Sequence, residues 1–335
     1  MNTEYQAPDT VHLPIEDNEH ADPEPLTNWA TISQFVVQVN KKSKVTAPIY
    51  ANGRQEIPIE IIIQARDADG VAVNLTAAQL KSIRLIEYDT GSAVDHVSYT
   101  KDERYEYYWP EIHEDGAEVQ RGASAENDVS SGTAQSVFRY VHKIELSTTW
   151  IAAEIIAPSG AVFRTNTPNP SPGKFDSWIK LEARQKKIYD HTVLSISRVD
   201  EVNVPFWDVD LYYIKFKDLS MRIVFSIHLT SPGNEAHSSC RVGDNRRAHI
   251  AYVRDSKRRV TFGGSDGLPA AEYYVNQRDG QATAARIQTW INYFGSRHHD
   301  ACMIYVDQYG NEARCMLCPN DGDDHNTMSL KEDPH

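Results

Sequence analysis

The feature that most constrains the fold is a run of alternating apolar residues between positions 57 and 65. Every second position in this run is apolar, namely Ile57, Ile59, Ile61, Ile63 and Ala65. A period of two places these side chains on one face of a β-strand, and β-branched side chains suit a pleated surface. Because one strand cannot bury that face alone, the run predicts a sheet that packs on a second sheet, as in a β-sandwich.

Turn dipeptides stand on both sides of this strand. Asn52-Gly53 precedes it and Asp69-Gly70 follows it, and such dipeptides tolerate the positive φ that a tight reversal needs. The alternation resumes after the second turn, at Val71, Val73 and Leu75. We therefore expect a strand–turn–strand unit over residues 46–75, with a hairpin reversal at each dipeptide.

This unit resembles the opening hairpin of bacterial immunoglobulin-like β-sandwich modules. In those modules an Ala-Asn-Gly or Ala-Asp-Gly turn precedes a β-branched strand that ends in Asp-Ala-Asp-Gly, and this chain reads ANGRQEIPIEIIIQARDADGVAV. The resemblance covers residues 46–75 only and implies adhesion or structural stacking rather than catalysis. The chain departs from the pattern at Thr76, where the residues up to Ser82 predict a short capped helix instead of a further strand.

Proline spacing and charge divide the chain. Three alternating prolines within 165–174 predict a stiff linker, because strand and helix interiors do not accept them. The linker would separate an immunoglobulin-like β-sandwich domain over 31–164 from a second β-rich domain over 175–318. An extended acidic arm over 1–30 and an acidic tail over 319–335 are expected at the two ends.

The predicted fold class is therefore mainly β, with two β-sandwich-like domains and one amphipathic helix. The helix is predicted over 281–294, because apolar residues there are spaced to share one helical face and Gly295 follows as a terminating residue. Those apolar residues are Ile287, Trp290, Ile291 and Phe294. After the helix, strands over 301–306 and 312–317 are expected to form a final hairpin.

Four residues near this hairpin have the spacing of a zinc knuckle. His299 with Cys302 and Cys315 with Cys318 make two short ligand pairs. Thiolates and an imidazole at such separations suit a tetrahedral ion, so zinc is the one cofactor that the sequence indicates. The alternative is that Cys302 and Cys315 lie opposite each other in the hairpin as small buried residues.

Basic residues gather between positions 241 and 259, although the whole chain has 47 acidic and 34 basic residues and a net charge of −13. The members predicted to bind a partner are Arg246, Arg247, Arg258 and Arg259. Arginine holds carboxylates in a bidentate manner, so an acidic protein partner or the acidic arm of a neighbouring copy is expected here. The alternative is a pair of strands whose basic faces meet solvent. The overall acidity argues against nucleic acid as the partner.

An aromatic and acidic segment contains Tyr107, Tyr108 and Trp109. Aromatic rings stack on sugars and dominate protein interfaces, so the segment is predicted to bind a glycan or a protein partner. The alternative is that the rings cover the end of a sheet.

The predicted function is that of a non-enzymatic structural or binding protein. It would self-assemble as a homo-oligomer, or dock to a protein partner, through its sandwich surfaces and its terminal segments, as in a phage-like particle, a filament or an adhesive surface layer. No phosphate loop and no dinucleotide fingerprint stands in the sequence. Two alternatives stay open: an effector or toxin that binds a glycan or receptor, and a hydrolase whose site leaves no local pattern.

The sequence also carries expectations about location. It has no apolar run of the length of a membrane span, and its first residues lack the charged and apolar parts of a secretory signal. We therefore expect synthesis in the cytoplasm, with any release by a non-classical route or within a particle.

Overall fold

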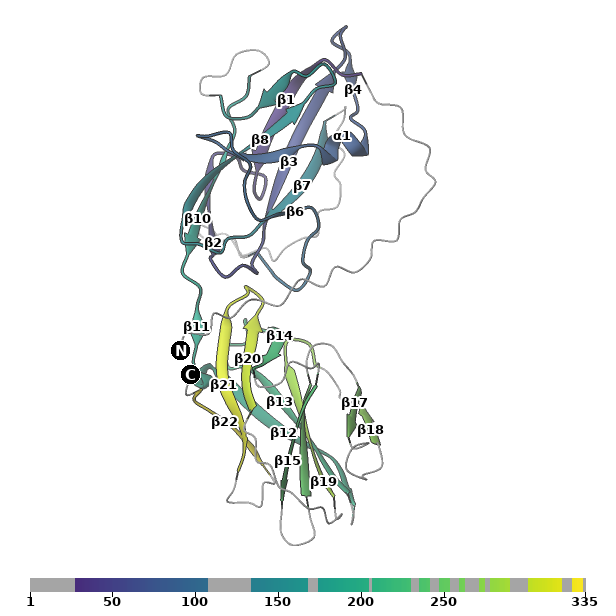
Figure 1. Cartoon of the computed structure of the whole chain (residues 1–335), viewed down its shortest axis with the longest axis vertical. Coiled ribbons are helices and arrows are strands. Elements are labelled where there is room, and N and C mark those ends of the chain that lie inside the picture. The colour runs from purple at the N-terminus through teal and green to yellow at the C-terminus, as the bar shows by residue number, and fades with distance from the viewer. Residues whose placement is uncertain are drawn as a thin grey trace.

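In the computed structural model the chain is mainly β, as predicted (Figure 1). The described residues are 28–107, 134–167, 174–204, 207–229, 235–241, 247–253, 259–262, 271–274, 278–289, 301–320 and 327–333. Their strands form four five-stranded sheets, which we number I to IV, and one two-stranded sheet.

Sheets I and II are formed by residues 31–184. Their strands are β1 (Thr31–Gln38), β2 (Val45–Tyr50), β3 (Ile57–Arg66), β4 (Ala72–Val73), β5 (Arg84–Glu87), β6 (Val97–Ser98), β7 (Gln135–Val141), β8 (Thr148–Ile156), β9 (Val162–Arg164) and β10 (Ile179–Arg184). Sheet I has the order β1-β3-β7-β6 with β4 beside β3, and sheet II has the order β2-β10-β8-β5 with β9 beside β8. The pair β2 and β10 is parallel, whereas the other pairs in these two sheets are antiparallel.

Sheets III and IV are formed by residues 188–331. Their elements, together with the two-stranded sheet, are β11 (Ile188–Tyr189), the 3₁₀-helix η1 (His191–Val193), β12 (Leu194–Val204), β13 (Trp207–Phe216), β14 (Ile223–His228), β15 (Glu235–Arg241), β16 (Arg247–Val253), β17 (Arg259–Phe262), β18 (Ala271–Tyr274), β19 (Ala282–Thr289), β20 (Ala301–Asp307), β21 (Glu312–Pro319) and β22 (Met328–Lys331). Sheet III has the order β11-β21-β20-β14 with β22 beside β21, and sheet IV has the order β12-β13-β19-β16-β15. The predicted final hairpin is confirmed as the antiparallel pair β20 and β21.

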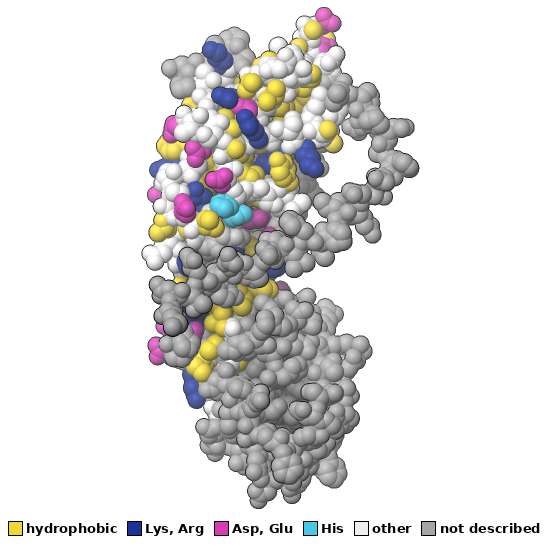
Figure 2. All heavy atoms as spheres, in the orientation of Figure 1, with side chains coloured by type: hydrophobic (Ala, Val, Ile, Leu, Met, Phe, Trp, Pro, Cys, Tyr) yellow, Lys and Arg dark blue, Asp and Glu magenta, His cyan; other side chains and the backbone are white. Residues whose placement is uncertain are grey.

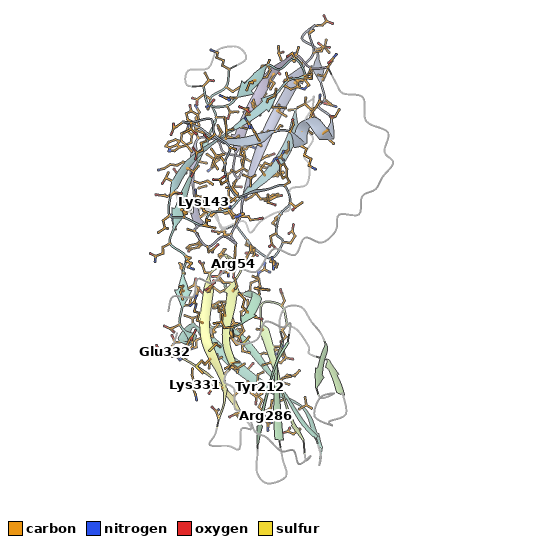
Figure 3. The ribbon with its side chains drawn as sticks, viewed as in Figure 1. Arg54, Lys143, Tyr212, Arg286, Lys331 and Glu332 are labelled. Atoms are coloured by element: carbon orange, nitrogen blue, oxygen red, sulfur yellow. The ribbon has the colours of Figure 1, made fainter. Side chains whose placement is uncertain are left out.

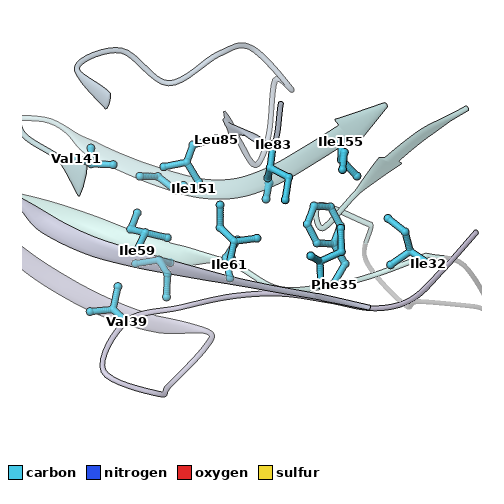
Figure 4. Close-up of a cluster of buried hydrophobic side chains, with 14 of the residues drawn as sticks. Ile32, Phe35, Val39, Ile59, Ile61, Ile83, Leu85, Val141, Ile151 and Ile155 are labelled. Atoms are coloured by element: carbon cyan, nitrogen blue, oxygen red, sulfur yellow. The ribbon is translucent and has the colours of Figure 1, made fainter. Parts of the chain in front are cut away.

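One cluster of buried side chains lies between sheets I and II (Figure 4). The alternation predicted for β3 is confirmed, because its residues from Ile57 to Ala65 are buried at every second position and partly exposed between. Ile59 and Ile61 meet side chains of sheet II such as Leu85 and Ile151. Full burial of an isoleucine stabilises a fold by about 1.5–3 kcal/mol, so the isoleucines of β3 are a large part of this core.

A second, separate cluster lies between sheets III and IV. Tyr212 and Phe216 of β13 meet Met303 of β20 and Leu317 of β21 there. Residues 28–184 and residues 188–333 thus each enclose a buried cluster of their own. We call these two parts the N-terminal region and the C-terminal region.

The reversal predicted after β3 is confirmed, but the one predicted before it is not a hairpin. Gly70 has a φ of 81°, and Asp67 N donates to Val71 O at 2.9 Å where β3 turns into β4. Gly53 also has a positive φ of 70°. However, β2 pairs with β10 in sheet II, whereas β3 lies in sheet I. The first dipeptide therefore carries the chain from one sheet to the other.

The short helix predicted after Thr76 is confirmed as α1 (Ala77–Lys81). Thr76 Oγ1 accepts a hydrogen bond from Gln79 N at 3.2 Å, and Gln79 Oε1 accepts one from Thr76 N at 2.9 Å. This reciprocal capping satisfies N–H groups that the first turn of a helix leaves without a partner. Within the described residues no helix has the length and apolar character that crossing a membrane requires.

The Pro-rich segment does not mark the change from one region to the other. Ser177 N donates to Thr165 O at 2.8 Å, so the chain on the two sides of the segment pairs with itself. Beyond it, β10 lies between β2 and β8, and its apolar side chains join the N-terminal cluster. The chain therefore passes from the first buried cluster to the second between Arg184 and Ile188, and not within 165–174 as the sequence predicted. Residues 168–173, which include the three prolines, lie outside the described residues.

The helix predicted over 281–294 is wrong in its described part, because Ala282–Thr289 is strand β19. This strand lies between β13 and β16, with Ala284 opposite Tyr212. A small residue opposite a large one lets neighbouring strands pack closely, and such pairing overrides a helical spacing. Residues 290–294 lie outside the described residues.

Both predicted termini contain residues that belong to the fold. At the C-terminal end, β22 pairs with β21 and Met328 is buried in the second cluster, so the predicted acidic tail over 319–335 includes a strand. At the other end, Trp29 is buried and Ala30 N donates to Arg66 O at 2.8 Å. The remainder of the predicted arm, residues 1–27, lies outside the described residues.

Candidate functional site

The candidate site is the contact between the turn of the β20–β21 hairpin and the residues that precede β3. In Figure 1 this turn is directed towards the N-terminal region, and Figure 3 shows Arg54 close above it. We call this contact the junction. Its members are Asn52, Arg54, Gln55, Glu106, Lys187, Arg222, Gln308, Tyr309, Gly310, Asn311 and Glu312.

The turn is built by one aspartate. Asp307 Oδ1 accepts hydrogen bonds from Tyr309 N and from Asn311 N, both at 2.8 Å. Gly310 has a φ of 79°, which suits the left-handed position of such a turn. Asp307 is itself fully buried, and this burial raises the pKa of its carboxyl group. The local sequence therefore makes a compact tip before any contact with the N-terminal region is counted.

The residues that meet this tip are also held by their own loop. Asn52 Oδ1 accepts hydrogen bonds from Arg54 N at 2.9 Å and from Gln55 N at 3.0 Å. The same arrangement leaves the Asn52 amide nitrogen to donate to Tyr309 O at 2.8 Å. Both sides of the contact are thus ordered by local hydrogen bonds, which lowers the conformational entropy lost when they meet.

Arg54 supplies the charged part of the junction. Its Nη1 donates to Gly310 O at 3.2 Å and to Glu312 Oε1 at 2.8 Å. Glu312 also accepts a hydrogen bond from Arg314 at 3.0 Å. Burial favours a higher pKa for Glu312, but the bonds from Arg54 and Arg314 outweigh it and lower the pKa of this carboxyl group. Glu312 is therefore ionised at neutral pH and stays paired with a residue of the other region.

Gly310 is required at the tip by space as well as by φ. A Cβ atom at this position would lie 2.7 Å from Arg54 Cβ and 2.9 Å from Asn52 Nδ2. Real Cβ atoms do not approach other heavy atoms so closely, and Arg54 Cβ cannot move without its backbone. A larger residue would push the two regions apart.

A second group of contacts lies beside the first. Glu106 N donates to Gln308 O at 2.6 Å, Arg222 N donates to Gln308 Oε1 at 2.9 Å, and the side chains of Arg222 and Glu106 form an ion pair. Next to them Tyr105 packs on Ile304 and Val306 of β20. The connecting segment joins in, because Lys187 N donates to Asn311 Oδ1 at 3.0 Å. The junction thus combines apolar, polar and charged contacts.

The side chains of the junction form a structural contact between the two regions. The polar atoms named above are engaged with protein partners, and the junction contains no serine, cysteine or histidine that a neighbouring base could activate. What the arrangement can do is to keep two β-rich regions at one mutual orientation.

The predicted zinc ligands lie in and near β20 and β21. Cys302 stands opposite Met316 and Cys315 opposite Met303, so the pleat places these two cysteines on opposite faces of sheet III. Burial raises the pKa of the Cys315 thiol to about 12, which disfavours the thiolate that zinc needs. The part of the chain that the structure describes holds no group of three or more metal ligands.

His299 lies outside the described residues, and Cys318 is buried at the end of β21. Zinc therefore stays a prediction. Metal analysis of the purified chain tests it directly, with about one zinc per chain expected if the knuckle forms.

The structure describes the predicted basic cluster only through its strands. Arg247 begins β16, opposite Arg241 of β15, and Arg259 begins β17. Arg246 and Arg258 lie outside the described residues, as do the side chains of Arg247 and Arg259. Their binding of a partner stays a prediction.

Among the predicted aromatic residues, Tyr107 is partly buried and packs against the N-terminal cluster. Burial raises the pKa of its hydroxyl group. This position agrees with a ring that covers the end of a sheet. Tyr108 and Trp109 lie outside the described residues.

Ser265 lies in a segment that matches the Gly-x-Ser-x-Gly pattern of a hydrolase nucleophile elbow, because residues 263–267 read Gly-Gly-Ser-Asp-Gly. These residues lie outside the described ones, between β17 and β18, which pair antiparallel. A nucleophile elbow instead joins a strand to a helix. The strands on either side therefore do not provide the setting that this motif needs.

Sequence reasoning missed the junction itself. The turns at Asn52-Gly53 and at Gly310 are visible as local motifs, but 257 residues separate Asn52 from the carbonyl it binds at Tyr309. No signal in a single sequence pairs two such turns. Comparison with known proteins found neither a family model nor a curated protein that matches this chain.

Proposed function

We propose that this chain is a non-enzymatic structural and binding protein that self-assembles or docks to a protein partner. The observation that supports this most is the junction, where Gly310, the ion pair of Arg54 with Glu312 and the hydrogen bond of Asn52 link the two regions. Contacts between domains are usually small and allow relative motion, so a contact with this many specific bonds favours a fixed spacing. A fixed spacing is what a building block of an assembly needs.

The finer form of the proposal is that each region is one β-sandwich-like domain. Sheets I and II share one buried cluster, and sheets III and IV share another, as two layers of a sandwich do. The immunoglobulin-like character of the first domain belongs to this proposal. The link between the domains would then be residues 185–187, which is too short to allow wide separation.

Surface composition supports binding to protein rather than catalysis. Figure 2 shows hydrophobic side chains interspersed with charged ones over the visible face of the N-terminal region. Large apolar side chains are exposed on the described surface, including Leu146 at 64% and Ile144 at 54% in the β7–β8 loop. The sequence of residues 1–27 adds seven acidic residues and no lysine or arginine. Such an acidic segment with apolar anchors can bind a basic surface of a neighbouring copy.

The experiment is light scattering coupled to size-exclusion chromatography, with electron microscopy of the eluted species. We expect regular oligomers whose population rises with protein concentration. Deletion of residues 1–26 is expected to weaken this association while both regions stay folded. A chain that remains monomeric at every concentration, and that captures no protein partner, would contradict the proposal.

A further inference from the structure

Two tryptophans lie on the face of sheet II that points away from its core. Trp150 precedes the buried Ile151, and Trp178 precedes the buried Ile179, so the pleat turns both indoles outward. Their ring centroids are 4.3 Å apart and their planes are inclined at 60°. Each indole is half-buried, and Lys180 Nζ lies over the Trp150 ring. The pair is thus a preorganised apolar corner on the surface.

Polar side chains border this corner. Asp176, two residues before Trp178, forms an ion pair with Lys44 Nζ at 2.6 Å and accepts a hydrogen bond from Tyr88 Oη at 2.8 Å. Backbone bonds hold both partners there, because Lys44 N donates to Trp178 O at 2.7 Å and Tyr88 N donates to Trp150 O at 2.8 Å. The aromatic pair and the polar group therefore belong to one built surface.

The protonation states of these groups suit binding to hydroxyl groups. The hydrogen bond from Lys44 lowers the pKa of Asp176, so this group is a carboxylate acceptor at neutral pH. Burial, with Asp176 close by, raises the pKa of Tyr88 to about 12, so its phenol keeps its proton. The Asp176 carboxylate can accept a hydrogen bond from one hydroxyl while the Lys44 ammonium group donates one to the next, which matches a vicinal diol.

We propose that this surface binds a neutral oligosaccharide, with a pyranose ring on the Trp150–Trp178 corner and neighbouring hydroxyls on Asp176 and Lys44. Indoles offer a rigid apolar face for the C–H groups of a sugar ring. Hydroxyl groups fit because the surface offers both a carboxylate and ammonium groups, with Asp176 beside Lys44 and Lys180 Nζ 5.9 Å from the centroid of the Trp150 ring. A protein partner fits less well, because neither tryptophan is among the exposed large hydrophobic side chains of the described surface.

The test uses the full chain and five soluble probes: cellohexaose, xylohexaose, laminarihexaose, chitohexaose and mannohexaose. Binding is measured by calorimetry and by the change in tryptophan fluorescence. We expect at least one probe to bind, and the affinity for it to fall at least tenfold in Trp178→Ala. If Trp178→Ala does not fold, Lys44→Ala serves as the second variant, because it changes only an exposed side chain. The matched control is Tyr99→Ala, an aromatic residue exposed at 53%, which should bind as the unchanged chain does.

Three results would overturn the inference. The first is that none of the five probes binds the full chain. The second is that both Trp178→Ala and Lys44→Ala bind the best probe as tightly as the unchanged chain. The third is that these variants alter self-association without any sugar binding, which would make the surface a contact between copies. Because sugar binding is measured separately from oligomeric state, failure of the assembly proposal leaves this test intact.

Discussion

The two regions differ in how they bury charged side chains. The core between sheets I and II is mainly aliphatic, with Ile57, Ile59, Ile61 and Ile63 on one strand. The buried Glu154 of sheet II pairs there with two arginines that are themselves exposed. Sheet IV instead buries both members of an ion pair. Arg286, labelled in Figure 3, is 0% exposed, and its Nη1 lies 2.7 Å from the fully buried Asp210 and 3.2 Å from Asp208. Arg198 adds a fourth charge at 2.7 Å from Asp210. We call these four residues the charged quartet.

This difference explains why one region was easier to predict than the other. In β3 a buried position is always apolar, so burial can be read from residue type. In β13 buried positions include Asp210 as well as Leu211 and Tyr212, so both faces are covered and the alternation disappears. Apolar periodicity predicts a strand only where one face meets the core and the other meets solvent.

The largest expected loss of stability is in the charged quartet. Arg286→Met should destabilise the C-terminal region by about 3–5 kcal/mol, because it leaves Asp210 buried with one arginine. Hydrogen exchange reports the loss separately for each region. The matched control is Lys101→Met, whose ion pair with Glu103 is exposed on both sides and should cost less than ~1 kcal/mol. Equal losses in the two variants would contradict the comparison.

The second-largest expected loss of stability is in the aliphatic core between sheets I and II. Ile61→Ala should destabilise the N-terminal region by roughly 3 kcal/mol, since it leaves a cavity among side chains that are fully buried. Ile62→Ala is the control, because Ile62 is partly exposed on the other face of β3. Urea unfolding compares the two variants. A larger loss for Ile62 would mean that the face assignment in β3 is wrong.

The smallest expected effect is a dependence of the stability of the N-terminal region on pH. His142 stacks on His96 with ring centroids 5.0 Å apart, and burial, with His96, lowers the pKa of His142 below its ordinary 6.5. The unfolded chain then binds a proton more readily than the folded one, so stability is full above pH 6.5 and falls as the pH drops towards the folded pKa. His142→Gln should flatten this slope in melting curves recorded between pH 7 and pH 5. A slope that is unchanged in the variant would assign the effect to other groups.

Local patterns predicted those features whose cause is local. The alternation in β3, the turn at Gly70 and the reciprocal cap of Thr76 with Gln79 depend on residues within one segment. The helical spacing over 281–294 failed because β19 is placed by its pairing with β13 and β16. The Pro-rich boundary failed for the same reason, since β10 is held by β2 and β8.

The junction was beyond prediction on similar grounds. The sequence marks Asn52, Gly53 and Gly310 as turn residues, but only the fold brings Gly310 against Arg54. The sugar-binding surface depends likewise on Trp150 and Trp178, which are neighbours only across the pairing of β8 with β10. Sites assembled from several strands leave no spacing that a single sequence can reveal.

We propose that the junction fixes the two regions relative to each other, and small-angle scattering of Gly310→Ala is the decisive experiment. The control is Gly160→Ala, which shares the positive φ but has nothing within 4 Å of the added Cβ. The account predicts that the unchanged chain and Gly160→Ala scatter as one compact arrangement, whereas Gly310→Ala has a larger radius of gyration while hydrogen exchange shows both cores folded. Identical scattering curves for Gly310→Ala and the unchanged chain would contradict it.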